Sequence, residues 1–169
     1  MPSLVRPMEE RDIPELDEWF GLKTDYGRDP SKWNELMHMH ADGTRVVVVA
    51  EHEGKTVGYC TLKFASEYPP LQEEDIPEIN DLVVAPPARR QGVARNIIEY
   101  LEQVARERGY KTIGICVGLY SHYGQAQRLY VKMGYIPDGQ GVFYDNKPCT
   151  PGATYKLDDE LVIGFTKEL

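Results

Sequence analysis

The segment Ala-Arg-Arg-Gln-Gly-Val-Ala-Arg at residues 88–95 combines positive charge with a glycine. Its charged residues and its glycine are Arg89, Arg90, Arg95 and Gly92. Arginine offers bidentate donors to anions, and a glycine lets an anion approach the backbone closely. A helical apolar pattern begins at Val93, next to the small Ala94, and the unpaired N–H groups of a helix start also attract anions. The segment therefore predicts a site that suits a pyrophosphate, and a helix start with solvated arginines is the alternative explanation.

Other phosphate-binding and nucleic-acid-binding patterns do not fit this sequence. The Walker pattern GxxxxGK[ST] and the dinucleotide pattern GxGxxG are both absent. The chain carries 27 acidic and 19 basic residues, which gives a formal net charge of −8. Nucleic-acid surfaces need an excess of lysine and arginine. We therefore expect a local anion site in an acidic protein, and no nucleic-acid partner.

Length and composition indicate one globular domain. The chain has 169 residues, of which 41% are hydrophobic and 27% charged, and this suits a single domain over residues 1–169. The first residues lack the apolar core of a signal sequence, and no run approaches the roughly 20 apolar residues of a membrane span. We therefore expect a cytoplasmic protein with no membrane partner. Cys60, Cys116 and Cys149 are far apart and form no CxxC pair, so we expect no metal site.

Apolar spacing and turn residues predict the order of helices and strands. The predicted strands lie near residues 3–8, 46–49, 57–64, 76–84, 111–117, 142–144 and 160–166. The predicted helices cover residues 9–22, 30–40, 93–108 and 121–134; Ser121 is the expected N-cap of the last, and Gly109 and Gly134 are expected stops. Residues 65–75, with paired prolines, predict a loop. The turn at Glu53 and Gly54 predicts an antiparallel hairpin, and the strands flanking helix 93–108 should be parallel, which indicates an α/β (α+β) fold.

Two segments resemble the GCN5-related N-acetyltransferase superfamily, abbreviated GNAT. The first is DLVVAPPARRQGVARNII at residues 81–98, where the family signature [RQ]-x-x-G-x-[GA] matches Arg89, Gly92 and Ala94. The second resembles N-x-x-A-x-x-x-Y-x-x-x-G-[FY] and matches Ala126, Tyr130, Gly134 and Tyr135, with Tyr123 where the family has asparagine. Both motifs lie on suitable elements at a suitable separation, so together they are far more specific than either motif alone.

The resemblance implies a fold and an activity. The fold would be the GNAT fold, a mixed central sheet of six to seven strands with about four helices. Its N-terminal part would be antiparallel, and a parallel pair of strands would be splayed at the coenzyme site. The activity would be that of an acyltransferase, and the later segments resemble a subgroup of small bacterial acetyltransferases with no assigned substrate.

The resemblance also implies which residues contact acetyl-coenzyme A (acetyl-CoA), the expected cosubstrate. The loop after the strand would bind its pyrophosphate through backbone N–H groups, and the strand itself would meet the pantetheine arm. The implied contacts are Leu82, Val83, Val84, Arg89, Arg90, Gln91, Gly92, Val93, Ala94, Arg95, Tyr123 and Gln125.

Acetyl transfer to an amine needs proton transfers, which the resemblance assigns to two side chains. Tyr130 would donate a proton to the departing thiolate, and Glu78 would accept a proton from the amine. Asp81 and a chain of waters are the alternatives to Glu78 as the base. A backbone N–H at Val83 or Val84 would stabilise the developing oxyanion. Strand periodicity places four residues of this strand on one face: Glu78, Asn80, Leu82 and Val84.

The implied acceptor is a primary amine of a small molecule or a peptide, which would attack directly in a ternary complex. Glu73, Glu74 and Asp75 in the expected loop would border the acceptor site and could attract a cationic amine, and a solvated acidic loop is the alternative. The early helical region would wall that site, and its aromatic residues are Trp19, Phe20, Tyr26 and Trp33. We expect some of them in the core, and an exposed one could stack on a ligand. Two alternatives stay open, namely a non-catalytic acyl-CoA sensor on the same fold and transfer of another acyl group. Homodimers are common on this fold, so a second copy of the chain is a candidate partner.

Overall fold

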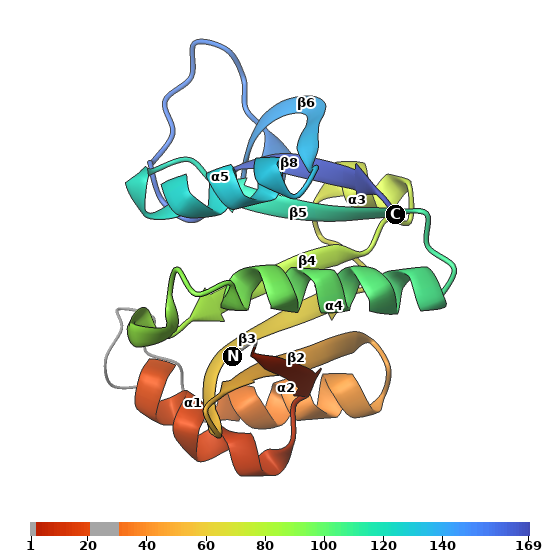
Figure 1. Ribbon diagram of the computed structural model, residues 1–169. Helices are drawn as coiled ribbons and strands as arrows, with labels where there is room; N and C mark the ends of the chain where they lie inside the picture. The colour runs from red at the N-terminus through yellow and green to blue at the C-terminus, as the bar shows by residue number, and fades with distance from the viewer. Residues whose placement is uncertain (1–2, 21–30) are drawn as a thin grey trace. The chain divides into compact units, whose positions relative to one another are not determined.

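The computed structural model describes residues 3–20 and 31–169, and Figure 1 shows its elements coloured along the chain. The chain divides into two compact units. Unit 1 comprises Met1–Lys63 and Asn80–Gln103, and unit 2 comprises Phe64–Ile79 and Val104–Leu169. Strand β4 (Glu78–Val84) and helix α4 (Val93–Glu107) each have residues in both units. The prediction of a single domain over residues 1–169 stays a prediction.

Unit 1 contains the N-terminal strands in the order β1-β2-β3-β4. Their bounds are Leu4–Pro7 for β1, Arg45–His52 for β2 and Lys55–Lys63 for β3. β2 pairs antiparallel with both β1 and β3. Glu53 and Gly54 take φ values of 51° and 76° between β2 and β3, the positive values that a two-residue hairpin turn requires. The predicted antiparallel hairpin is confirmed.

Helices cover both faces of the strands in unit 1. A 3-10 turn, η1 (Glu10–Asp12), leads into α1 (Ile13–Phe20), and α2 (Ser31–Ala41) follows. Buried residues of α1 and α2 form one apolar cluster with Val47, Val49 and Tyr59. The residue before Tyr59, Gly58, faces α4 instead, because a Cβ there would lie 3.5 Å from Cδ1 of Ile97. Successive residues of β3 therefore point to different helices, as strand geometry requires.

Unit 2 continues from β4 in the order β4-β5-β8-β6-β7. The bounds are Thr112–Gly118 for β5, Ile136–Tyr144 for β6, Lys147–Pro148 for β7 and Leu161–Glu168 for β8. β4 pairs parallel with β5 through Glu78–Gly114 and Ile79–Ile115, and β8 pairs antiparallel with β5 and β6. The predicted fold class, with antiparallel strands and one parallel pair, is confirmed. The described strands number eight because the two-residue β7 adds one beyond the six or seven expected.

The helices of unit 2 correct two predictions. Residues 65–75 were expected to be a loop, but they contain α3 (Pro69–Glu73). Pro69 and Pro70 occupy its first positions, where a missing N–H costs nothing. The second correction concerns Ser121, which is not an N-cap because it begins a 3-10 turn, η3 (Ser121–Tyr123), that leads into α5 (Gly124–Lys132).

Close packing in unit 2 depends on glycines within strands. A Cβ on Gly114 of β5 would lie 2.5 Å from both terminal carbons of Leu71, so α3 packs directly against the strand backbone. Leu71 shares a buried cluster with Tyr68 and Phe143. Gly109 and Gly134 follow α4 and α5 with φ values of 88° and 92°, so both predicted helix stops are confirmed.

Candidate active site

The anion-binding turn lies in unit 1 between β4 and α4. A short 3-10 turn, η2 (Pro86–Ala88), follows β4, and the N–H of Ala85 donates to the carbonyl of Val57 at 2.8 Å. Gly92 has a φ of 84°, and a Cβ added there would meet nothing within 4 Å. The N–H of Asn96 donates to the carbonyl of Gly92 at 3.0 Å. The N–H groups of residues 93–95 therefore precede the first hydrogen bond of the helix and suit an anion.

The polar side chains of this turn fall into two groups. Arg89 Nε donates to the carbonyl of Val84 at 2.9 Å, and Gln91 Nε2 donates to the carbonyl of Pro87 at 2.9 Å. These bonds brace the loop from within. Arg90 is exposed and has a φ of 66°, and the exposed Arg95 lies 3.8 Å from Glu99 one helical turn later. Arg90 and Arg95 therefore place their charge at the surface of unit 1.

The β4 residues that the resemblance assigns to the coenzyme lie at the edge of the unit 1 core. Leu82, Val83 and Val84 are half-buried, and Val83 packs against the apolar cluster of α1 and α2. Asp81 has a φ of 60°, which regular extended backbone does not adopt. The predicted alternation of faces along residues 78–84 is therefore interrupted at Asp81.

Glu78 begins β4 within unit 2 and is buried, with 5% of its surface exposed. Its Oε2 accepts a hydrogen bond of 2.6 Å from the hydroxyl of Ser66, which is itself buried. A carboxylate in a buried site with one short donor is fixed in orientation. Glu78 therefore has the setting of an oriented proton acceptor and not that of a solvated strand residue.

The α5 residues lie in unit 2. Tyr130 is 5% exposed, and its ring centroid lies 6.2 Å from that of Tyr135. Tyr123 donates its phenol proton to Asp159 at 2.8 Å, and its ring fills the space beside Gly118. Gln125 is exposed. The hydroxyl of Tyr123 therefore bonds to another residue of unit 2. This contact is not predicted by the family motif, which has asparagine at this position.

The predicted acceptor-site residues divide between core and surface. Phe20 and Trp33 are fully buried in unit 1, where both rings contact the ring of Tyr59. Phe20 and Trp33 are therefore among the early aromatic residues that were expected in the core. Trp19 is half-buried against the same cluster, and Tyr26 lies outside the described residues. Glu73, Glu74 and Asp75 are exposed at the end of α3.

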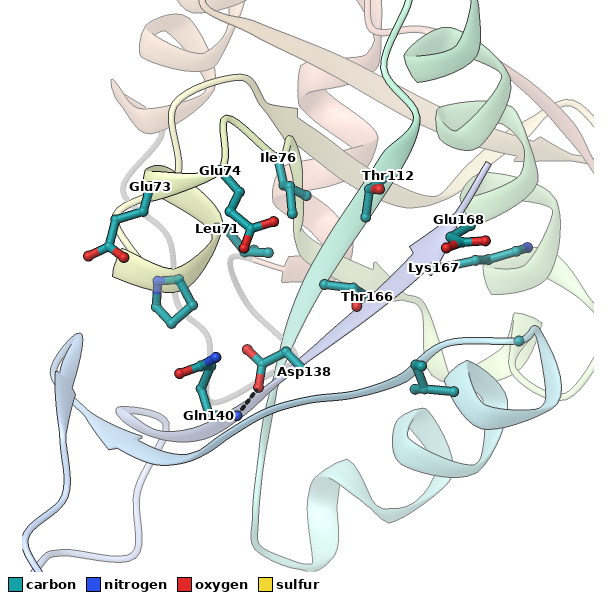
Figure 2. Close-up of a pocket in the computed structure, with 13 residues that line it drawn as sticks. Leu71, Glu73, Glu74, Ile76, Thr112, Asp138, Gln140, Thr166, Lys167 and Glu168 are labelled. Carbon is teal, nitrogen blue, oxygen red and sulfur yellow. Dashed lines mark hydrogen bonds between the residues drawn. The ribbon is translucent and has the colours of Figure 1, made fainter.

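A pocket of about 690 Å³ lies in unit 2 beside α3. Figure 2 shows Glu74 and Asp138 on facing sides of it, with Thr112 and Thr166 on the strands between. Its charged lining residues are Glu73, Glu74, Asp138, Glu168 and Lys167. Four of these five side chains are acidic. The pocket contains none of the residues assigned to the coenzyme, and its charge suits a cationic ligand.

The thiol of Cys60 does not have the setting of a reactive nucleophile. Cys60 is fully buried, and desolvation together with the nearby charge of Asp81 raises the pKa of its thiol. A raised pKa disfavours the nucleophilic thiolate. Within the described parts of the chain, no three histidine, cysteine or acidic side chains gather as metal ligands would. The expectation of no metal stays a prediction.

The described helices also bear on membrane association. None of the helices in residues 3–20 and 31–169 is long and apolar enough to cross a membrane.

A comparison with known protein families identifies the family of this chain. A family model described as "Acetyltransferase (GNAT) family" matches residues 11–135. The chain belongs to this family. The match includes β4, the turn at Gly92 and all of α5, so both motif segments of this GNAT acetyltransferase lie inside it. No curated protein matches the sequence.

Solved structures share the GNAT fold at low sequence identity. An N-acetyltransferase from Staphylococcus aureus Mu50 is 17% identical with a TM-score of 0.73, and the match covers 99% of each chain. A ribosomal-protein-alanine N-acetyltransferase from Brucella melitensis is 19% identical with a TM-score of 0.72, covering 98% of this chain and 99% of the other. An aminoglycoside 6'-N-acetyltransferase in complex with coenzyme A is 17% identical with a TM-score of 0.65. The match covers 98% of this chain and 96% of the other. At these identities the likeness concerns the fold.

Several residues that organise the candidate site were not predicted from the sequence. Ser66 holds Glu78, and the N–H of Tyr68 donates to Ser66 Oγ at 3.0 Å. A serine hydroxyl that accepts from the N–H two residues later is a known turn-forming arrangement, so the sequence did contain a signal. Asp138 and Asp159 accept phenol protons from residues 70 and 36 positions away, and no local pattern reports such distant contacts.

Proposed function

We propose that this GNAT acetyltransferase transfers the acetyl group of acetyl-CoA to a primary amine of a small molecule or a peptide. The transfer is a direct attack within a ternary complex. The observation that carries the proposal is the turn at Gly92, which combines a positive φ, open space and the start of α4. A pyrophosphate fits such a turn because backbone N–H groups can approach it without side-chain obstruction.

The coenzyme contacts follow from the same turn. Residues 92–95 offer their backbone N–H groups to the pyrophosphate, and Arg90 and Arg95 add surface charge. Arg89 and Gln91 hold the loop in shape through their bonds to backbone carbonyls. Leu82, Val83 and Val84 contact the pantetheine arm, with Tyr123 and Gln125 as further contacts from α5.

The proposed chemistry moves two protons. Acetyl-CoA supplies the acetyl group as a thioester. The amine nitrogen bonds to the carbonyl carbon, the bond from that carbon to sulfur breaks, and the thiolate leaves with the electron pair. Glu78 accepts the proton that the amine loses, and Tyr130 donates a proton to the thiolate. Asp81 and a water chain stay the alternatives to Glu78, and a β4 N–H at Val83 or Val84 is the proposed oxyanion donor.

The acceptor is proposed to be cationic before it reacts. The pocket beside α3 has four acidic side chains and one basic one, and this field attracts a protonated amine. Three of the structural neighbours are named for acceptors with amino groups: a ribosomal-protein alanine, an aminoglycoside and spermidine. An alanine-terminated peptide, an aminoglycoside and a polyamine are therefore the acceptors to try first.

Calorimetric titration with acetyl-CoA tests the coenzyme part of the proposal. We expect micromolar binding by the parent protein, and its loss in Arg90→Ala and Gly92→Glu variants. Arg106→Ala removes the same charge near the other end of α4 and should bind like the parent. Equal binding by all four proteins would exclude the Gly92 turn as the coenzyme site.

A thiol-release assay tests the transfer part. The parent protein, acetyl-CoA and each of the three amines are incubated together, and the acetylated amine is measured beside the free thiol. Equal amounts of both products support acetyl transfer to the amine. Coenzyme binding without turnover of any primary amine would favour the acyl-CoA sensor.

A further inference from the structure

Glu78 is held by a buried hydroxyl, that of Ser66. The distance from Ser66 Oγ to Glu78 Oε2 is 2.6 Å, within the range of charge-assisted O–H···O⁻ bonds. Ser66 is 2% exposed and Glu78 is 5% exposed, so bulk water does not compete for this bond. A short bond between two buried side chains fixes the position of both.

The neighbouring backbone determines the direction of this hydrogen bond. A serine hydroxyl has one proton and can also accept. The N–H of Tyr68 donates to Ser66 Oγ at 3.0 Å, so the oxygen already acts as an acceptor on that side. Its single proton is then directed at Glu78, whose ionised carboxylate can only accept. The hydrogen bond therefore runs from Ser66 to Glu78 and holds the Glu78 carboxyl group in one orientation.

The segment that carries Ser66 is anchored within unit 2. Tyr68 precedes α3, and its carbonyl accepts from the N–H groups of Leu71 and Gln72. Its phenol donates to Asp138 Oδ2 at 2.6 Å, and its ring lies edge-on to that of Phe143 at 4.7 Å. Ser66 is therefore attached to a rigid element and not to a free loop.

We propose that Ser66 is a positioning residue for the general base of this acetyltransferase. Its hydrogen bond fixes one oxygen of Glu78, Oε2, so that Oε1 is the oxygen that receives the proton from the amine. The inference rests on the proposed role of Glu78 as the base. The titratable groups on neighbouring elements of unit 2 are Glu67, Tyr68, Glu73, Glu74, Cys116 and Asp138.

Four variants separate this inference from the proposed function. Ser66→Ala removes the hydroxyl. Ser66→Cys replaces it with a thiol of similar size that is only a weak donor, and serves as a second variant in case the alanine variant does not fold. Ser66→Thr keeps the hydroxyl, and Glu78→Gln removes the base. Ser121→Ala is the matched control, because this exposed serine lies elsewhere in unit 2. The readouts are the pH profile of kcat/KM with acetyl-CoA and the best of the three amines, and the pH midpoint of the Glu78 carboxyl carbon signal in NMR.

A positioning role predicts a distinct pattern. In Ser66→Ala and Ser66→Cys, kcat/KM should fall about tenfold near neutral pH, since a hydrogen bond to a charged group is lost. The acid limb of the profile and the NMR midpoint should both differ from those of the parent protein. Ser66→Thr should restore both, and Ser121→Ala should change neither.

Two results would contradict the proposal, each at a different step. If the NMR midpoint and the acid limb stay unchanged in both Ser66→Ala and Ser66→Cys while Glu78→Gln loses activity, Ser66 does not position the base and the proposed function stands. If Glu78→Gln keeps the full rate and the same acid limb, Glu78 is not the base, so the inference about Ser66 and that part of the proposed function both fall. If no amine is turned over, the NMR midpoint alone decides whether Ser66 controls Glu78.

Discussion

Leu71 of α3 occupies the space in which a side chain at Gly114 of β5 would stand. Its Cδ1 and Cδ2 atoms both lie 2.5 Å from the position of a Cβ on that glycine. Replacement of Gly114 by alanine therefore forces α3 away from the strand. We expect the free energy of unfolding to fall by about 2 kcal/mol, as is typical of an overpacked core, and urea denaturation measures it.

Gly124→Ala provides the control for this prediction. Gly124 is the first residue of α5, its φ is −58°, and a Cβ there would meet nothing within 4 Å. Alanine should leave stability unchanged or raise it by about 0.5 kcal/mol through helix propensity. Equal stabilities for the two variants would show that the contact of Leu71 with Gly114 is not tight in solution.

The buried pair of Arg6 and Asp12 predicts acid sensitivity in unit 1. Burial opposes the ionisation of Asp12, but hydrogen bonds from Arg6, from the N–H of Glu9 and from Thr56 outweigh it and lower its pKa. A carboxyl group with a lowered pKa contributes stability above its unfolded-state value of 3.8, and this stability is lost as the pH falls through the folded-state pKa. Asp12→Asn should cost about 3 kcal/mol at pH 7, because it leaves Arg6 without its main partner.

The pH dependence gives the second half of this test. Thermal unfolding should show a smaller loss of stability between pH 5 and about pH 2 in Asp12→Asn than in the parent protein. Glu10→Gln changes an exposed carboxyl group in the same 3-10 turn and should follow the parent curve. If the parent and Asp12→Asn lose stability in parallel, the Asp12 carboxylate carries no acid-linked stability.

Tyr68 predicts a loss of stability at high pH in unit 2. Desolvation, followed by its hydrogen bond to Asp138, raises the pKa of its phenol above the ordinary value of 10.0. The unfolded chain therefore loses this proton first, so the stability that Tyr68 provides is complete below pH 10 and declines as the pH rises above it. Tyr68→Phe should lower the free energy of unfolding by about 1 kcal/mol at neutral pH and flatten its decline above pH 10.

Chemical denaturation at a series of pH values checks this prediction. Tyr110→Phe is a suitable control, since Tyr110 also lies in unit 2 and its ring can keep its stacking on Phe64. The free energy of unfolding of Tyr110→Phe should decline above pH 10 as that of the parent protein does. An unchanged slope in Tyr68→Phe would mean that other groups cause the decline.

Tyr130 predicts a kinetic effect without a binding effect. If its phenol protonates the departing thiolate, Tyr130→Phe should reduce kcat about 100-fold and leave the acetyl-CoA affinity within about threefold of the parent. Steady-state thiol release and calorimetry measure the two quantities separately. A parallel loss of affinity and stability would instead identify Tyr130 as a packing residue beside Tyr135.

Much of the fold is predictable from local patterns. The hairpin at Gly54, the apolar stripe of α4 and the glycines after α4 and α5 are each encoded within a few residues, and each prediction is confirmed. α3 was missed because five residues with two prolines contain little helical periodicity. Its stability comes from Leu71 packing on a distant strand, which no local pattern contains.

The candidate site is predictable only in part. The types and spacing of residues 88–95 indicated the turn that the structure contains, with Gly92 at positive φ. The orientation of Glu78 was not predictable, because its partner Ser66 lies in the segment that was taken for a loop. The alternation along β4 is interrupted at Asp81, because a residue at positive φ departs from regular extended backbone.

The strand order of unit 2 has a consequence for the way the chain is made. β8 is the last strand in sequence, yet it lies between β5 and β6 in the sheet. On the ribosome, β5 and β6 emerge first and have no direct pairing to form with each other. We expect nascent chains that stop before Leu161 to expose two unpaired strand edges and to depend on chaperones, with protease resistance of unit 2 appearing only once β8 has emerged.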